Sequence, residues 1–174
     1  MNKKVNVVQD ADCNNIVLIN DIIFKSRRLI NWHDVEEYLK KYIGQSVEII
    51  ETAEKVYIGT DFPDEFSHSI DTKNLKGANE KAKANIASAV KELVKIANNK
   101  LESQDYENKH KSKAKNGWYR YDTRFGIPVY DECGELIRYN VFKARMLVRC
   151  DKDDKLYLYD FVRIKKETSK PLEQ

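Results

Sequence analysis

The sequence predicts an α+β fold: N-terminal hairpins and a short helix, then a long helix packed on a C-terminal antiparallel β-meander. Two periodicities lead to this prediction. Apolar residues recur at helical spacing in residues 31–44 and 78–100, whereas residues 118–167 alternate between apolar and polar side chains, as strands do. Turn residues at 131–134 and 151–154 divide this last region into three strands. Helices followed by a run of strands are typical of an α+β domain.

Shorter patterns predict the N-terminal elements. Residues 14–26 contain two apolar runs separated by an Asn-Asp pair, which predict a hairpin or a bent strand. In the helix of residues 31–44, Asn31 can cap the N-terminus and Gly44 can provide a left-handed end. We therefore expect a short, well-delimited helix after the first strands.

The middle of the chain predicts a second hairpin, a loop and the long helix. Residues 46–59 contain two short apolar runs that flank four polar or small residues. Residues 60–77 contain Pro63 and several Asp and Ser residues without a period, which indicates a loop. In residues 78–100 the apolar positions form one continuous stripe, and its alanines allow close packing against a sheet. The stripe comprises Ala82, Ile86, Ala89, Val90, Leu93, Ile96 and Ala97.

Length and composition indicate one globular domain. The chain has 174 residues, of which 41% are hydrophobic and 34% are charged. We therefore expect a flexible N-terminus of residues 1–14 and a single domain of residues 15–172. No apolar run is long enough for a signal peptide or a membrane span, so a cytoplasmic protein with no membrane partner is expected. The three cysteines are widely spaced without a C-x-x-C motif, which predicts neither a disulfide framework nor a zinc site.

Positive charge is concentrated in residues 109–125, where six lysines and arginines face one aspartate, a balance of +5 against +3 for the whole chain. In the strands that follow, one face is apolar and the other basic and aromatic. Such a face suits single-stranded nucleic acid, RNA in particular, because cations attract phosphates and rings stack on bases. The alternative is an ordinary solvent-exposed sheet face. The predicted nucleic-acid-binding residues are Lys111, Lys113, Lys115, Tyr119, Lys143, Arg145, Tyr157, Tyr159, Arg163 and Lys165.

Several residues of this region could also cleave a phosphodiester. The imidazole of His110 could transfer a proton, and the surrounding positive charge favours its neutral form, which suits a base. Arg120 and Arg124 could stabilise the charge that develops on the phosphate oxygens, and the hydroxyl of Thr168 could bind a phosphate oxygen. The alternative is an exposed histidine, solvated arginines and a strand that ends in a capped turn.

The remaining motifs indicate no metal and no cofactor. Asp61, Asp64, Glu65 and His68 could in principle hold Mg²⁺ or Mn²⁺, but their spacing matches no metal template. We therefore interpret them as a polar loop with helix-capping acids. The chain contains no phosphate-binding loop, no dinucleotide fingerprint, no G-x-S-x-G or H-E-x-x-H motif and no Cys/His nucleophile arrangement.

Five segments carry a resemblance to a known domain: DFPDEF, GANEKAKANIASAVKELVKIA, KNGWYRYDTRF, RYNVFKARMLVR and LYLYDFVRIKKETSKPL. Across residues 20–172 the chain resembles an uncharacterised domain of phage minor-head and conjugative-element polyvalent proteins. That domain is similar to the barnase, colicin and RelE-like ribonuclease superfamily. The resemblance implies a helix-then-meander fold and metal-independent RNA cleavage by attack of the 2′-hydroxyl.

The same resemblance assigns roles to individual residues. It implies that His110 is the base or the acid, that Arg120 and Arg124 clamp the phosphate, and that Thr168 is an edge hydroxyl. No second histidine lies near His110, so a Tyr, Lys or Arg acid remains an alternative, as does the absence of catalysis.

The predicted function is that of a mobile-element-associated, RNA-binding, toxin-like endoribonuclease. RNA is one expected partner, and an immunity or other partner protein is the second. The alternative is a non-enzymatic module of a phage or conjugative element that binds protein or nucleic acid.

Overall fold

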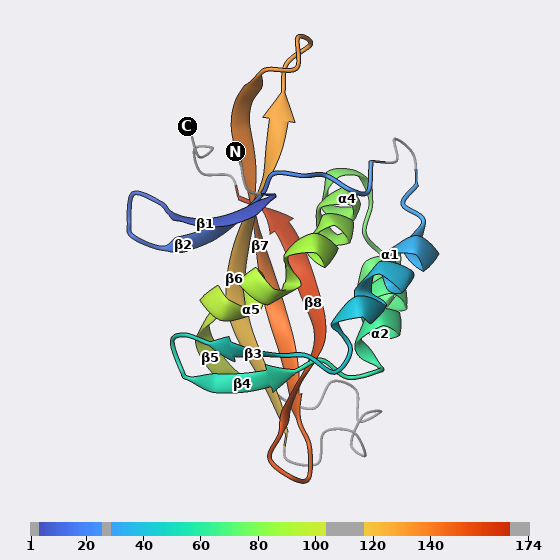
Figure 1. The fold of residues 1–174 in the computed structure, drawn as a ribbon, viewed down its shortest axis with the longest axis vertical. Helices are drawn as coiled ribbons and strands as arrows, with labels where there is room; N and C mark the ends of the chain where they lie inside the picture. The colour runs from blue at the N-terminus through green and yellow to red at the C-terminus, as the bar shows by residue number, and fades with distance from the viewer. Residues whose placement is uncertain (1–3, 26–28, 104–116, 168–174) are drawn as a thin grey trace.

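The computed structural model describes residues 4–25, 29–103 and 117–167 and has an α+β fold built on one curled, mixed sheet (Figure 1). Among these residues no helix combines the length and the hydropathy that a bilayer crossing requires. The N-terminal half contains β1 (Val5–Gln9), β2 (Asn15–Ile19), α1 (Trp32–Leu39), the 3₁₀ turn η1 (Lys40–Tyr42), β3 (Ser46–Ile49), β4 (Glu54–Tyr57), α2 (Phe62–His68) and α3 (Ile70–Lys73). The C-terminal half contains α4 (Gly77–Asn85), the 3₁₀ turn η2 (Ile86–Ala89), α5 (Val90–Ile96), β5 (Asn98–Ser103), β6 (Trp118–Tyr130), β7 (Leu136–Cys150) and β8 (Leu156–Lys166).

The predicted C-terminal meander is confirmed. β6 pairs with β7 and β7 with β8, both antiparallel, and these long strands form the centre of the sheet. The order is β1-β2-β6-β7-β8-β4-β3, and β5 also pairs with β6. Two pairings are parallel, β2 with β6 and β4 with β8, so the sheet is mixed. The N-terminal hairpins therefore extend both sides of the meander.

The first of these parallel pairings places a glycine of β6 beside a leucine side chain of β2. A Cβ atom at Gly126 of β6 would lie only 2.8 Å from Leu18 Cδ2 of β2, so a larger residue here would require the Leu18 side chain to shift. Leu18 is the register partner of Gly126. The absence of a side chain at Gly126 leaves room for the Leu18 side chain between the two strands.

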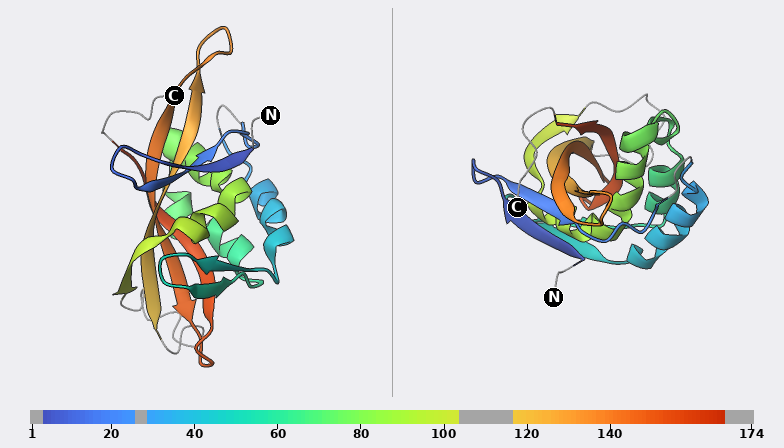
Figure 2. Two further views of the ribbon diagram at one scale, coloured as in Figure 1. Left: turned by 60° about the vertical axis from the view of Figure 1, so that its left-hand side comes forward. Right: turned by 90° about the horizontal axis from the view of Figure 1, so that it is seen from above.

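The helical run α4–η2–α5 packs on the concave core side of the strands, with α5 crossing in front of the sheet in Figure 1. Val90, Leu93 and Val94 of α5 are completely buried in the main core. In the same core the rings of Phe125 and Phe142 stack with centroids 5.4 Å apart. Full burial of each such side chain stabilises the fold by about 1.5–3 kcal/mol. Figure 2 shows that α1–α4 lie together on one side of the curled strands.

The local helix and hairpin predictions are confirmed at several points. The Asn31 side chain accepts hydrogen bonds from the backbone N–H groups of His33 and Asp34 and so caps α1. Gly44 adopts φ 89°, the left-handed conformation expected where the helix ends. Strands β3 and β4 form the predicted hairpin.

The long helix and the preceding loop differ from their predictions. The helical run is interrupted by η2 and ends at Ile96, and residues 98–103 form β5 in place of its last turn. The interruption occurs at Ala89, whose φ of −129° and ψ of 18° are not helical. Residues 60–77, predicted as a loop, contain α2 and α3, because Pro63 is compatible with a first helical turn and Phe62 and Phe66 both reach the core.

The first strands also differ from their prediction. Strand β2 pairs with β1, which precedes it, so residues 14–26 do not form a hairpin of their own. Residues 5–9, which the sequence placed in a flexible N-terminus, thus form an edge strand of the sheet. Ile22 and Phe24 instead pack against the core, where the Asn85 side chain accepts hydrogen bonds from the backbone N–H groups of Ile23 and Phe24.

Strand β8 does not keep the simple alternation that its sequence suggests. Its register against β7 shifts twice, once on each side of the pair Arg145 and Val162. As a result Phe161, which strict alternation would place on the basic and aromatic face with Tyr159 and Arg163, is buried in the main core against Phe62 and Phe66, while Val162 joins a separate cluster with Leu147. Each bulge inserts one residue and so reverses the side on which the following residues lie.

A buried ionic cluster joins α4, α3 and β8. Lys83 is completely buried, and its ammonium lies 2.6 Å from Thr72 Oγ1, 3.0 Å from Asp160 Oδ1 and 3.5 Å from Asp71 Oδ2. Asp160 is also buried. Burial raises the pKa of its carboxyl to about 7, although the ammonium of Lys83 acts in the opposite direction.

Candidate nucleic-acid interface

A cleft of ≈ 890 Å³ opens between the β1–β2 turn, the start of β5, the middle parts of β6 and β7, and the C-terminal end of β8. We refer to it as the sheet cleft. Five cationic and four acidic side chains line it, which leaves a formal charge of one positive unit. The cations are Arg124, Lys143, Arg145, Arg163 and Lys165, and the acids are Asp10, Asp12, Asp122 and Glu167.

Four of the predicted nucleic-acid-binding residues meet in this cleft: Lys143, Arg145, Arg163 and Lys165. Lys143 of β7 lies directly opposite Lys165 of β8 in the strand ladder. The register shift beside this pair adds one residue to β8, and Arg163 there adopts φ 53°. Two antiparallel strands and a bulge thus bring together cations that are well separated along the chain.

These four cations have no carboxylate partner within the described part of the chain. Lys143, Arg163 and Lys165 are exposed, and Arg145 is half-buried. Two lysines directly opposite one another in a ladder repel, which costs some stability. The arrangement leaves positive charge available to an anion that enters the cleft.

Arg124, predicted as a phosphate clamp, is already bound by two carboxylates. Its Nε and Nη2 donate to the two oxygens of Glu167 at 2.7 and 3.0 Å, and its Nη1 donates to Asp10 Oδ2 at 2.7 Å. The bond to Glu167 raises the pKa of Arg124, and the bond from Arg124 lowers the pKa of Asp10. The side chain therefore ties the β1–β2 turn to the end of β8 and is not a free cation of the cleft.

The predicted aromatic residues do not line the sheet cleft. Tyr159 is buried, and its ring packs edge-on against Trp118 at 4.8 Å. The ring of Tyr157 lies 5.8 Å from that of Tyr57, and the guanidinium of Arg149 lies 4.4 Å from its centre. These rings are occupied by protein contacts, so the predicted stacking platform is not formed by them.

Tyr119 lines a separate cavity of ≈ 460 Å³ beside β4 and β5. The ammonium of Lys100 lies 4.2 Å from its ring centre and is also paired with Glu54. Glu54 accepts a second hydrogen bond, at 2.8 Å, from the buried Tyr121 hydroxyl. The Lys100–Glu54 pair holds β5 against β4 and places the ammonium of Lys100 over the Tyr119 ring.

The predicted catalytic residues are not assembled by the described residues. Arg120 is half-buried on β6 between its register partners Leu101 and Leu147, and it does not line the sheet cleft. His110, Lys111, Lys113, Lys115 and Thr168 lie outside the described residues. Of the expected group His110, Arg120 and Arg124, only Arg124 is therefore placed at the cleft.

The acids of the cleft were not predicted from the sequence. Asp122 is exposed, lies opposite Arg145 in the ladder and accepts a hydrogen bond from Asn99 at 3.1 Å. Asp10 and Glu167 come from a turn and from a strand end. No sequence signal links these positions, because only the pairing of the strands brings them to one place.

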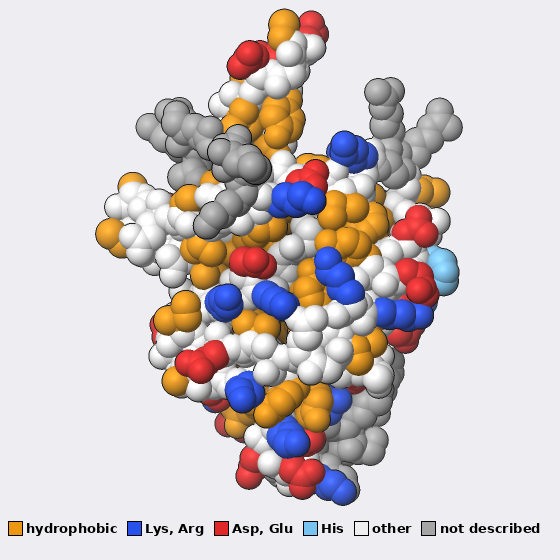
Figure 3. All heavy atoms as spheres, viewed as in Figure 1, with side chains coloured by type: hydrophobic (Ala, Val, Ile, Leu, Met, Phe, Trp, Pro, Cys, Tyr) orange, Lys and Arg blue, Asp and Glu red, His pale blue; other side chains and the backbone are white. Residues whose placement is uncertain are grey.

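The helix-covered face of the molecule has a different charge distribution. In Figure 3 the lysines and arginines of this face are spread singly among apolar and polar atoms. Single exposed lysines are ordinary surface residues. The group of cations in the sheet cleft is consequently the stronger candidate for an anion-binding surface.

Comparison with protein-family models, with curated proteins and with solved structures finds no match for this chain.

Proposed function

We propose that the protein binds single-stranded RNA through its phosphate backbone in the sheet cleft. The observation that supports this proposal best is the convergence of Lys143, Arg145, Arg163 and Lys165 without carboxylate partners among the described residues. Lysine and arginine bind phosphate with a strong electrostatic contribution that does not depend on base sequence.

The composition of the cleft favours phosphates over bases. The described lining contains no Phe, Trp, Tyr or His side chain, so it offers no ring on which a base could stack. A flexible single strand can follow a curved cleft, whereas a duplex is stiff and resists bending. We expect weak sequence preference and an affinity that falls steeply with salt, in the range of about 10⁻⁴–10⁻⁶ M at physiological ionic strength.

Binding can be measured by fluorescence anisotropy of a labelled, unstructured RNA over a series of salt concentrations. The double variant Lys143→Ala/Lys165→Ala should bind more weakly, and the slope of log K against log salt should fall by about 1.4, which corresponds to two lost phosphate contacts. The matched control is Lys73→Ala/Lys95→Ala, which removes two exposed lysines outside the cleft. Equal losses in both double variants would mean that RNA responds only to net charge, and the cleft would be rejected as the site.

Metal-independent cleavage of the bound RNA is a second proposal, and it rests on the resemblance and on His110 and Arg120. Labelled transfer and messenger RNA are incubated at low salt with EDTA, and the ends of any fragments are analysed. Cutting that leaves cyclic phosphate ends and disappears in His110→Ala would support a ribonuclease. Binding without cutting would favour a non-enzymatic nucleic-acid-binding module instead.

A further inference from the structure

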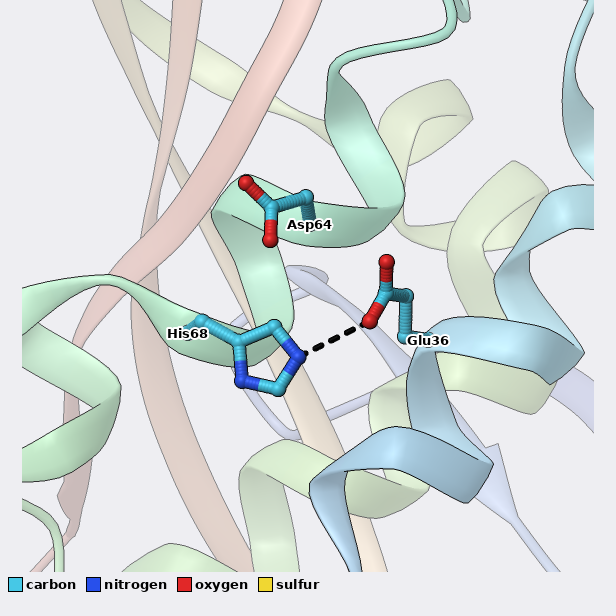
Figure 4. Close-up of side chains that lie close together, drawn as sticks. All are labelled: Glu36, Asp64 and His68. Atoms are coloured by element: carbon cyan, nitrogen blue, oxygen red, sulfur yellow. Dashed lines mark hydrogen bonds and ion pairs between the residues drawn. The ribbon is translucent and has the colours of Figure 1, made fainter.

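We propose that Glu36, Asp64 and His68 form a binding site for a divalent transition-metal ion such as Zn²⁺. Each residue contributes one ligand atom, and these atoms all lie within 4.8 Å of one another. Figure 4 shows the imidazole and the two carboxylates converging from two neighbouring helices. The three residues lie outside both the sheet cleft and the cavity beside Tyr119, so this site is independent of the proposed RNA binding.

The backbone that carries these side chains is held by the core. Asp64 and His68 are four residues apart on α2, a spacing that places both on one side of a helix, and Glu36 projects from α1. Between the two ligands of α2, Phe66 is completely buried and its ring lies 6.3 Å from that of Trp32 in α1. The two helices are therefore fixed against each other before any ion binds, which favours binding because little order has to be gained.

The spacing of the ligand atoms is close to what a metal requires. His68 Nε2 and Glu36 Oε1 are 2.9 Å apart. Ligand atoms at about 2.0–2.1 Å from a tetrahedral Zn²⁺ are separated by little more than this distance. An ion can thus take the place of the hydrogen bond between His68 and Glu36, and small rotations of the exposed Asp64 side chain complete a three-ligand set. A water molecule would take the fourth position.

The donor set selects the class of ion. Imidazole nitrogen is a preferred ligand of zinc and neighbouring transition metals, whereas Mg²⁺ and Ca²⁺ prefer oxygen ligands only. In the described residues neither Glu36 nor Asp64 forms an ion pair with a lysine or arginine, so their two negative charges are left for a cation. The side chains of His68 and Glu36 are 39% and 21% exposed, which lets an ion enter from solvent.

The other acids of this segment are engaged elsewhere. Asp61 pairs with Arg149 at 3.3 Å, and Glu65 lies beside the hydroxyl of Tyr159. The third ligand comes from Glu36, which no local spacing rule connects to α2. This explains why the sequence matches no metal template although three ligands meet in the fold.

Titration of the full chain with Zn²⁺ by calorimetry tests the proposal. We expect one equivalent to bind, and an excess of about a hundredfold over Kd to raise Tm by about 5 °C or more. His68→Ala and Asp64→Asn should each weaken Zn²⁺ binding by at least about 10-fold. Loss of a residue that only hydrogen-bonds to a metal ligand already lowers metal affinity by about this factor. Mg²⁺ should cause no comparable shift.

The chain offers close controls. His33 is exposed on α1 and lies outside the ligand set, so His33→Ala should bind Zn²⁺ as the unchanged protein does. Cys13→Ser/Cys133→Ser removes the two exposed thiols and should also leave the affinity unchanged. Absence of one-equivalent binding, equal binding of Mg²⁺, or full binding by Asp64→Asn and His68→Ala would each overturn the proposal. Because Asp64 is exposed, its variant keeps the test valid even if His68→Ala folds poorly.

Discussion

Two sites in this protein place lysines in opposite surroundings. Lys83 is completely buried and is bound by Asp160, Asp71 and Thr72, whereas Lys143 and Lys165 are exposed, face one another and have no described acidic partner. A buried ammonium without partners would cost far more than the fold could tolerate, so its neighbours are part of the core. The exposed pair costs little and remains available for a ligand. The surroundings of a lysine, and not its presence, separate a structural from a binding role.

The largest expected effect is the loss of the buried cation. Lys83→Met should lower the free energy of unfolding by about 3–5 kcal/mol at pH 8, above the pKa of Asp160, because an ionised Asp160 would be left buried without its partner. Urea unfolding measures this change. The matched variant Lys143→Met in the cleft should change stability by less than about 0.5 kcal/mol. Similar losses of unfolding free energy in both variants would contradict a structural role for Lys83 that Lys143 lacks.

The buried pair should also make stability depend on pH. The pKa of Asp160 is raised to about 7 from an ordinary value of 3.8, so between these values the folded chain keeps a proton that the unfolded chain has lost. The contribution of this group to stability is therefore complete below about pH 4 and declines as pH rises toward 7, by at most about 1.4 kcal/mol per pH unit.

Asp160→Asn cannot titrate, so it should lack this decline. Unfolding free energies at several pH values, compared between the two proteins, isolate the contribution because all other groups are shared. Parallel curves for the variant and the unchanged protein would show that Asp160 does not carry the effect.

Arg124 shares a feature with each of the two lysine sites. It lines the cleft, as Lys143 and Lys165 do, but it is bound by two carboxylates, those of Asp10 and Glu167, as Lys83 is by Asp160 and Asp71. Arg124→Ala should reduce stability by about 1–2 kcal/mol, since charge-assisted hydrogen bonds are lost at a partly exposed site. Arg145→Ala should be nearly neutral for stability but should weaken RNA binding. A larger loss of stability in Arg145→Ala than in Arg124→Ala would contradict the structural role assigned to Arg124.

The smallest effect concerns an acid of the cleft. Asp122→Asn removes a negative charge next to the free cations and should strengthen RNA binding about twofold at low salt, with little change in stability. The control Glu132→Gln removes an exposed charge outside the cleft and should leave the affinity unchanged. Anisotropy titrations of both variants make the comparison, and weaker binding by Asp122→Asn would argue against phosphate contacts at this place.

Local sequence patterns predicted much of the fold but little of the site. The meander, the cap at Asn31 and the β3–β4 hairpin follow from short-range periodicity and turn chemistry, and all are present. The positions of Phe161 and Val162 could not be predicted, because a bulge reverses the alternation without leaving a clear sequence signal. Partners that come together only through tertiary pairing, such as Asp10 with Arg124 and Glu36 with His68, were also missed.

The two parallel pairings of the sheet have a consequence for how the chain folds. Strand β2 can be completed only when Val17 meets Phe125, and β4 only when Val56 meets Leu156. The first half of the chain therefore has no stable sheet of its own until the meander is present. Closing such long loops makes folding slow, and strand edges stay open in the meantime. During synthesis on the ribosome, the early strands should remain prone to association until β8 has emerged.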